Sequence, residues 1–289
     1  MVSPSARRAG VEYLLEQRGY SQRRGCRLVG ISRSSARYVA KQAADEPALA
    51  QAVWDQAHKH PSYGYRRVAV MLRRAGWGVN VKRVHRLWRK AGLQVPRRKT
   101  IKRRAGQPTE GLKRAEFANH VWTYDFMSGR TERGNKVRIL NVLDEYTREC
   151  LLMLVAPSIA SKKVIQALDW LFLTRGAPGH LRSDNGPEFI AYAIQDWLKA
   201  RHCQTIYITP GSPWENPFIE SFNGHLRAEL LDRVLFTNGQ EAKQIIEQWR
   251  LEYNQQRPHS SLRYLTPAEF AAQTGAAQPR SEPLATLSL

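Results

Sequence analysis

The second part of the chain changes its residue pattern at short, regular intervals, and this alternation restricts the fold more than any other feature. Three segments rich in β-branched and aromatic residues come first, at 121–127, 136–146 and 149–156. Turn-forming residues separate them at 128–135 and near Thr147. Such spacing predicts a three-stranded meander.

Helices and two further short strands follow the meander. They are a helix at 162–175, a strand at 180–183, a helix at 187–201, a strand at 204–209, and helices at 215–231 and 239–255. The apolar residues of the first of these helices fall on one face. This order predicts an α/β domain with a mixed five-stranded sheet and helices on its faces, as in a ribonuclease-H-like fold.

The positive charge of the chain is concentrated in its first part. Residues 1–118 hold 27 Lys and Arg against 7 Asp and Glu, whereas residues 119–289 hold 18 of each. Basic side chains that neutralise phosphates release counterions and gain affinity. The charge therefore predicts a nucleic-acid partner, with a solvated basic surface or an arm for an acidic protein as alternatives.

The basic part shows two helix-turn-helix patterns, and it predicts an all-α DNA-binding region. The first pattern has a helix ending near Gly30 and a second helix that Ser32 caps and that continues through Val39. The polar side of that second helix carries Arg33, Arg37 and Lys41. A structural hairpin with solvated arginines is the alternative.

The second pattern has helices at 48–58, 65–75 and 81–91, with Asn80 as the cap of the third. An apolar stripe on the third helix is formed by Val81, Val84, Leu87, Trp88 and Ala91. The candidate DNA-contacting residues of this helix are Lys82, Arg83, Arg86, Arg89 and Lys90. Beyond it, Arg97 and Arg98 lie in a basic stretch without apolar periodicity, which we expect to follow phosphates.

These patterns divide the chain into expected parts. They are a helix-turn-helix-like segment at 1–44, a second helix-turn-helix domain at 45–95, a basic linker at 96–117, a catalytic domain with C-terminal helices at 118–275, and a flexible tail at 276–289. We expect a cytoplasmic protein, because no signal peptide is visible and no apolar run is long enough to cross a bilayer.

Three acidic residues lie at positions that are typical of metal-binding carboxylates. Asp125 lies inside an apolar strand, and alternation predicts that it faces away from Trp122 and Tyr124. A carboxylate there is costly unless it is paired or bound to a metal. Asp184 follows a short strand, where sites of α/β sheets lie. Glu220 lies on a predicted helix among residues that bury. Three acids can hold two Mg²⁺ ions for phosphodiester chemistry.

The sequence around these acids resembles the D,D(35)E core of retroviral integrases and insertion-sequence transposases. Thirty-five residues separate Asp184 from Glu220, and this spacing alone is weak evidence. The segments that carry the resemblance are 183–189, 220–224, 253–262 and, for the preceding helix-turn-helix, 60–67. The resemblance covers about residues 20–272.

The resemblance implies a bacterial DNA transposase of the type encoded by the second of two overlapping frames. Asp125, Asp184 and Glu220 would be its catalytic and metal-binding residues, with Mg²⁺ as cofactor and Mn²⁺ as a substitute. Such enzymes bind terminal inverted repeats, nick the 3′ ends and join the freed 3′-OH to target DNA. Arg227 falls where the family has a DNA-contacting Lys or Arg. Pro217 departs from the family's small residue, although a first helical turn accommodates proline.

The resemblance also implies homo-oligomers on DNA and, in many relatives, fusion to an upstream-frame product. No heptad pattern is visible here, and zinc is not expected because the His/His/Cys/Cys module is missing. A catalytically silent, transposase-derived regulator is one alternative function. A nuclease acting on RNA–DNA hybrids is another, which the tandem helix-turn-helix units oppose.

Two further acids, Asp144 and Glu145, end a strand near the predicted site. We interpret them as capping residues or partners of Arg148. The alternative is a supporting role beside the metal.

Overall fold

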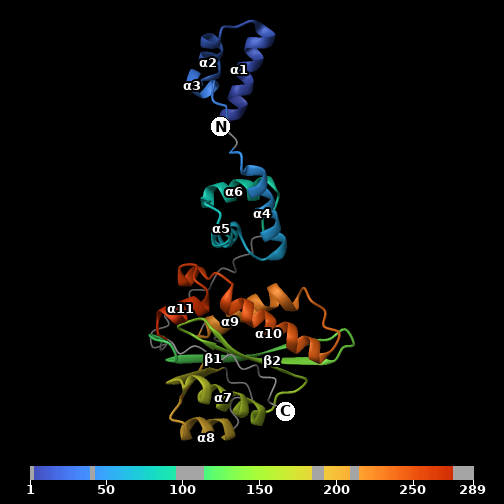
Figure 1. The fold of residues 1–289 in the computed structure, drawn as a ribbon, viewed down its shortest axis with the longest axis vertical. Coiled ribbons are helices and arrows are strands. Elements are labelled where there is room, and N and C mark those ends of the chain that lie inside the picture. Colours follow the sequence, from blue (N-terminus) through green and yellow to red (C-terminus); the bar gives the residue numbers. More distant parts are fainter. Residues whose placement is uncertain (1–2, 40–42, 96–113, 184–191, 209–214, 276–289) are drawn as a thin grey trace. The chain divides into compact units, whose positions relative to one another are not determined.

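A computed structural model describes residues 3–39, 43–95, 114–183, 192–208 and 215–275. The chain divides into two compact units, residues 1–51 and 52–289. Figure 1 shows their helices and strands. The predicted linker and tail lie almost entirely outside the described residues, as do Arg97 and Arg98.

The first unit contains α1 (Pro4–Arg18), α2 (Gln22–Val29) and α3 (Arg33–Ala36). Gly30 ends α2 with a φ of 69°, a left-handed conformation that glycine adopts without steric cost. The Ser32 side chain accepts a hydrogen bond from the Ser35 backbone and so begins α3. The predicted helix, glycine turn and serine cap are therefore confirmed.

Two details of this unit differ from the sequence prediction. Helix α1 was not predicted. The second helix of the motif ends at Ala36 rather than continuing through Val39. The side chains of Tyr38 and Val39 are 60% and 81% exposed, so burial does little to offset the low helix propensity of these residues.

The second unit begins with the larger part of α4 (Glu46–Lys59), followed by α5 (Tyr65–Arg74) and α6 (Val81–Lys90). The predicted apolar stripe of α6 is buried at Val84, Leu87 and Trp88. Ala91, in contrast, is exposed and caps the C-terminus of the helix. The Asn80 side chain accepts a hydrogen bond from the Lys82 backbone, as its predicted capping role requires.

The described residues also form the predicted mixed five-stranded sheet, with the strand order β3-β2-β1-β4-β5. β1 pairs antiparallel with β2 and parallel with β4, and the remaining pairs are β2–β3 antiparallel and β4–β5 parallel. The strands are β1 (Val121–Arg130), β2 (Lys136–Asp144), β3 (Cys150–Ala156), β4 (His180–Ser183) and β5 (Gln204–Tyr207).

Helices cover both faces of this sheet (Figure 1). Helices α7 (Ser161–Arg175) and α8 (Tyr192–Ala200) pack on the face that carries Trp122 and Tyr124. Helices α9 (Pro217–Leu226) and α10 (Gly239–Gln255) pack on the opposite face. The remaining elements are a π-helix (Arg227–Leu231), a 3-10 helix (Ser260–Leu262) and α11 (Pro267–Gln273). Trp122 and Tyr124 pack on one face of the sheet and Met127 on the other, which confirms the alternation predicted for β1.

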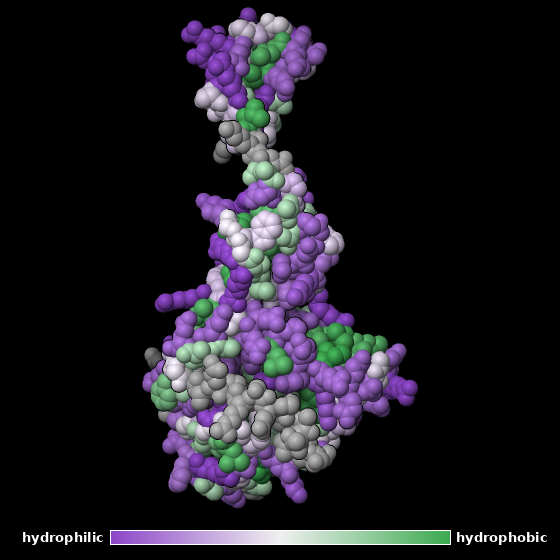
Figure 2. Space-filling model, viewed as in Figure 1, coloured by the Kyte–Doolittle hydropathy of each residue, from purple (hydrophilic) through white to green (hydrophobic). Residues whose placement is uncertain are grey.

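No helix in the described parts of the chain is long and apolar enough to cross a membrane. On the face shown in Figure 2, hydrophobic side chains occur in small, separate patches among hydrophilic ones. Isolated patches of this kind are normal on protein surfaces.

Candidate active site

The first candidate acid, Asp125, lies near the middle of β1 and is half-buried. Its Oδ1 accepts a hydrogen bond from the Phe126 backbone N–H at 2.7 Å, and its Oδ2 accepts one from Asn223 Nδ2 at 2.7 Å. Both carboxylate oxygens are thus held by protein N–H groups. The strand therefore presents a fixed carboxylate on the α9 side of the sheet.

A pair of asparagines positions that carboxylate. Asn223 lies on α9 and joins β1 to β2, because its Oδ1 accepts a hydrogen bond of 2.7 Å from Asn141 Nδ2. Asn141 is also the direct cross-strand neighbour of Asp125. Its own Oδ1 is buried and has no hydrogen-bond partner among the described residues. A buried oxygen of this kind calls for a water or an ion.

Helix α9 carries Glu220 one turn before Asn223, so the same hydrogen bond that holds Asp125 fixes the helix bearing the second acid. Glu220 itself is exposed, and the pKa of its carboxyl is raised because the side chain is partly desolvated. The predicted helix and the position of Glu220 on it are confirmed.

The N-terminus of α9 is anchored to β1 as well. Asn216 precedes the helix, and its Oδ1 accepts a hydrogen bond of 2.7 Å from the buried Thr123 hydroxyl. Pro217 occupies the first helical position, where its missing N–H removes no hydrogen bond. The proline is thus compatible with the predicted placement of Glu220.

The third acid, Asp184, lies outside the described residues. Strand β4 ends at Ser183, the residue before it, and β4 pairs with β1 through Thr123 and Arg182. The described structure brings together elements that carry or adjoin all three predicted acids.

The described groups fit a hard divalent cation. Asp125 and Glu220 supply carboxylate oxygens, which Mg²⁺ and Mn²⁺ prefer. Asn141 Oδ1 adds a buried polar oxygen without a partner beside Asp125. The two asparagines were not singled out in the sequence. A polar residue inside the apolar strand 136–144 is the signal that could have revealed Asn141.

Behind the site, Asp144 and Glu145 have structural partners. Asp144 accepts backbone hydrogen bonds from Asn119, Tyr146 and Thr147, as the capping interpretation expects. Burial nevertheless raises the pKa of Asp144. Glu145 binds Arg182 at 2.7 Å, so pairing with Arg148 is wrong for its carboxylate.

The reason for this correction is geometric. Arg148 donates instead to the Glu145 backbone carbonyl, and its guanidinium stacks on Phe218. Burial raises the pKa of Glu145 to about 7, although Arg182 opposes that change. Because Arg182 lies on β4, its ion pair with Glu145 connects β4 to the end of β2.

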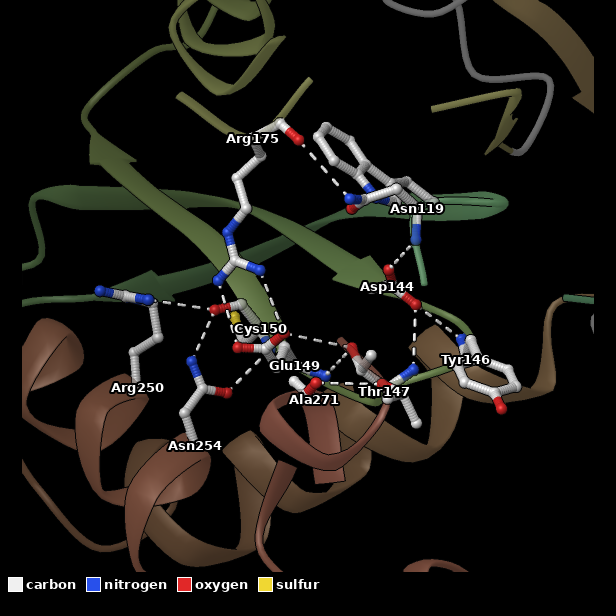
Figure 3. A network of polar contacts seen from close by, with 12 residues as sticks. Asn119, Asp144, Tyr146, Thr147, Glu149, Cys150, Arg175, Arg250, Asn254 and Ala271 are labelled. Carbon is white, nitrogen blue, oxygen red and sulfur yellow. Dashed lines mark hydrogen bonds and ion pairs between the residues drawn. The ribbon is translucent and has the colours of Figure 1, made fainter. Parts of the chain in front are cut away.

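A second buried network supports the end of the sheet (Figure 3). Arg175 of α7 binds both carboxylate oxygens of Glu149, at 3.0 and 3.1 Å. Asn254 of α10 accepts from the Cys150 backbone N–H and donates to the Cys150 carbonyl. Asn254 therefore pairs α10 with β3 in the way that a neighbouring strand would.

Other residues of the motif at 253–262, whose role the sequence left open, make structural contacts of their own. Tyr253 is buried against Phe222 of α9. Arg257 is also buried and binds Glu229 of the π-helix through its Nε and Nη2 at 2.8–3.2 Å. His259 lies in the loop after α10 and is buried beside Tyr253. The motif fastens α9 and the π-helix to α10.

The candidate DNA-contacting residues have different surroundings. Arg227 is exposed at the start of the π-helix that continues α9. On α6, Lys82, Arg86, Arg89 and Lys90 are exposed, while Arg83 is half-buried. In the first unit Arg33 is exposed, and Arg37 donates a hydrogen bond of 2.8 Å to Gln22.

Three stretches of the chain match known protein families. Residues 115–213 match one integrase core domain family, and residues 201–267 match another of that description. Residues 44–100 match an HTH-like domain family.

Individual relatives extend over most of the chain. It is 40% identical over 259 residues to an uncharacterized protein of insertion element IS407 from Burkholderia multivorans, covering 89% of this chain and 92% of that protein. It is 36% identical over 271 residues to an uncharacterized protein of insertion element IS476 from Xanthomonas euvesicatoria, covering 94% and 78%. A transposase for insertion sequence element IS904 from Lactococcus lactis is 26% identical over 247 residues, with coverage of 80% and 96%.

The fold is similar to a chain in the intasome of simian T-cell lymphotropic virus, determined in complex with the PP2A regulatory subunit B56 gamma. The TM-score is 0.50 at 15% identity, and the match covers 79% of this chain and 76% of that chain. At this identity the likeness concerns the fold alone.

Proposed function

This chain belongs to the family of insertion-sequence transposases with an integrase core domain, and we propose that it nicks the 3′ ends of its own element and joins them to target DNA. The observation that carries the proposal is the hydrogen bond between Asn223 of α9 and Asp125 of β1. It fixes the Glu220 helix against the strand that bears the other described acid.

Asp125, Asp184 and Glu220 form the proposed catalytic triad and hold the cation, Mg²⁺ or Mn²⁺. When bound, the cation lowers the pKa of the attacking hydroxyl or water and stabilises charge on the leaving oxygen. The chain's own contribution is to hold these carboxylates in place through Asn223 and Asn141. Fixed carboxylates need little reorganisation during the reaction.

DNA binding is assigned to the helical modules and to the surface next to the triad. We propose that Lys82, Arg83, Arg86, Arg89 and Lys90 of α6 contact the terminal inverted repeats. Arg33 and Arg37 of the first unit add a second contact, and Arg97 and Arg98 of the linker follow phosphates. Arg227 contacts DNA beside Glu220. Their charges favour phosphate contacts, and the exposure of most of the described ones leaves those accessible.

The reaction requires two ends to be held together, so we propose a homo-oligomer assembled on DNA. Dependence on an upstream-frame product stays a prediction. So do the domain boundaries beyond the matched families.

The test is a cleavage and joining assay on labelled DNA that carries the element's terminal repeats, with Mg²⁺ or Mn²⁺. Wild type should give specific 3′ nicks and joined products, and Glu220→Gln should give neither while still binding the DNA. Glu132→Gln, an exposed acid in the β1–β2 turn, is the matched control. DNA binding without chemistry in wild type would favour the regulator alternative.

A further inference from the structure

A cavity of about 350 Å³ lies beside helix α9, within the second compact unit. One wall is formed by residues of α9, among them Phe218, Ser221 and His225. Its volume falls in the range of ligand-binding pockets. The remaining lining includes Arg67, Arg148, Arg257, His259, Ser260 and Ser261.

Arg148 is a basic residue of the cavity lining whose guanidinium is held in place by two contacts. Its guanidinium lies 3.6 Å from the centroid of the Phe218 ring and donates one hydrogen bond to the Glu145 carbonyl. Stacking fixes the plane of the guanidinium, and most of its five N–H donors remain for another acceptor. Burial lowers the pKa of Arg148, which shows that its charge is poorly solvated there.

The carboxylates near Arg148 are engaged elsewhere. Glu145 binds Arg182, and the two oxygens of Asp144 accept backbone N–H groups. The cavity therefore offers Arg148 no carboxylate of its own among the described residues.

Arg67 is a second partly buried cation in the cavity lining. Burial, and then the neighbouring charge of Arg257, lower the pKa of Arg67 of α5. The carboxylate nearest to this pair, Glu229, is bound through both oxygens to Arg257. Among the described residues that line the cavity, three are arginines and none is a carboxylate. The nearby acids compensate this positive charge only in part, because they are bound to other groups, and an excess of buried positive charge is costly. A bound anion would remove that cost.

We propose that this cavity binds one phosphodiester group of the DNA strand held at the active site. The inference rests on the proposed function: Ser221 lines the cavity and follows Glu220 directly on α9, so a strand held at Glu220 would come within reach of this wall. A flat guanidinium matches two phosphate oxygens at once, and the hydroxyls of Ser221, Ser260 and Ser261 add donors. The site would hold the strand on the side of α9 that faces the 253–262 motif.

The salt dependence of DNA binding by the full chain tests the proposal. Each phosphate contact contributes about 0.9 to the slope of log affinity against log salt concentration. Arg148→Gln should lower that slope by about this amount, whereas Arg148→Lys should retain it. Arg201→Gln, which breaks an exposed ion pair with Asp169 after α8, is the control for the loss of one positive charge. Equal slopes for Arg148→Gln and wild type would overturn the proposal.

A second measurement guards against a folding defect and identifies the source of the phosphate. Terminal-repeat DNA with single neutral methylphosphonate linkages should show one position near the nick where wild type loses affinity. Arg148→Gln should show no further loss at that position. Stabilisation of wild type by inorganic phosphate, with no sensitive position in the DNA, would contradict the DNA assignment. If wild type binds DNA with these properties but does not nick it, the proposed function fails and the phosphate site stands.

Discussion

Replacing Asn223 with alanine removes the amide that joins Asp125 to Asn141. The lost bond is a 2.7 Å hydrogen bond to a carboxylate, in a site where Asn141 Oδ1 already has no partner. A hydrogen bond to a charged group is worth about 1.5–3 kcal/mol. If that energy is realised in the transition state, the nicking rate falls roughly 10- to 150-fold.

The assay is single-turnover nicking of terminal-repeat DNA across a range of Mg²⁺ concentrations. Because Asn223 holds the carboxylate that we propose as a metal ligand, the Mg²⁺ concentration for half-maximal rate should rise as well, by about 10- to 100-fold. DNA affinity should stay unchanged. Asn135→Ala, in the exposed β1–β2 turn, is the control. A normal rate and a normal Mg²⁺ requirement in Asn223→Ala would refute the positioning role.

The remaining predictions concern stability and DNA binding. Burial and the charge of Arg257 lower the pKa of His259 to about 2 from 6.5, so the unfolded chain binds a proton below pH 6.5 that the folded chain does not. The contribution of His259 to the free energy of unfolding should therefore fall by roughly 2 kcal/mol between pH 7 and 5. It is measured by denaturant unfolding as the difference between wild type and His259→Gln, because Glu145, with its raised pKa, changes stability in the opposite direction in both proteins. The same pH dependence in both proteins would contradict this. Arg257→Ala leaves Glu229 without its partner and should lower the free energy of unfolding by about 3–5 kcal/mol, measured in the same way. Arg257→Lys should lower it by less, and equal losses in the two variants would contradict the ion-pair argument. Arg89→Ala should weaken binding to terminal-repeat DNA and lower the salt slope by about 0.9, whereas an unchanged isotherm would remove α6 from the interface.

The sequence predicted elements wherever a strong local pattern agreed with the tertiary structure. The alternation of β1 placed Trp122 and Asp125 on opposite faces, as observed. The helix predicted at 239–255 likewise matches α10. Glu220 was predicted from the sequence segments that resemble the transposase family, and not from its distance to Asp184 alone.

Other features depend on residues distant in the chain, which local patterns cannot reveal. Glu145 pairs with Arg182 across 37 positions because β4 and the end of β2 meet in the fold. Asn254 bonds to a strand 104 positions earlier. The role of Asn223 depends on α9 packing against β1, which the local sequence does not reveal. Helix α3 ends before Val39, whose side chain is 81% exposed, and a local pattern carries no information about burial.

The measurement that tests the central claim most directly is strand transfer of a pre-cut element end that already carries a free 3′-OH. It compares wild type with Asp125→Asn and Glu220→Gln, and DNA binding is recorded in the same samples. The account predicts joined products from wild type with Mg²⁺, none after chelation, and none from either variant despite normal binding. Joining by Asp125→Asn or Glu220→Gln at the wild-type rate would contradict it.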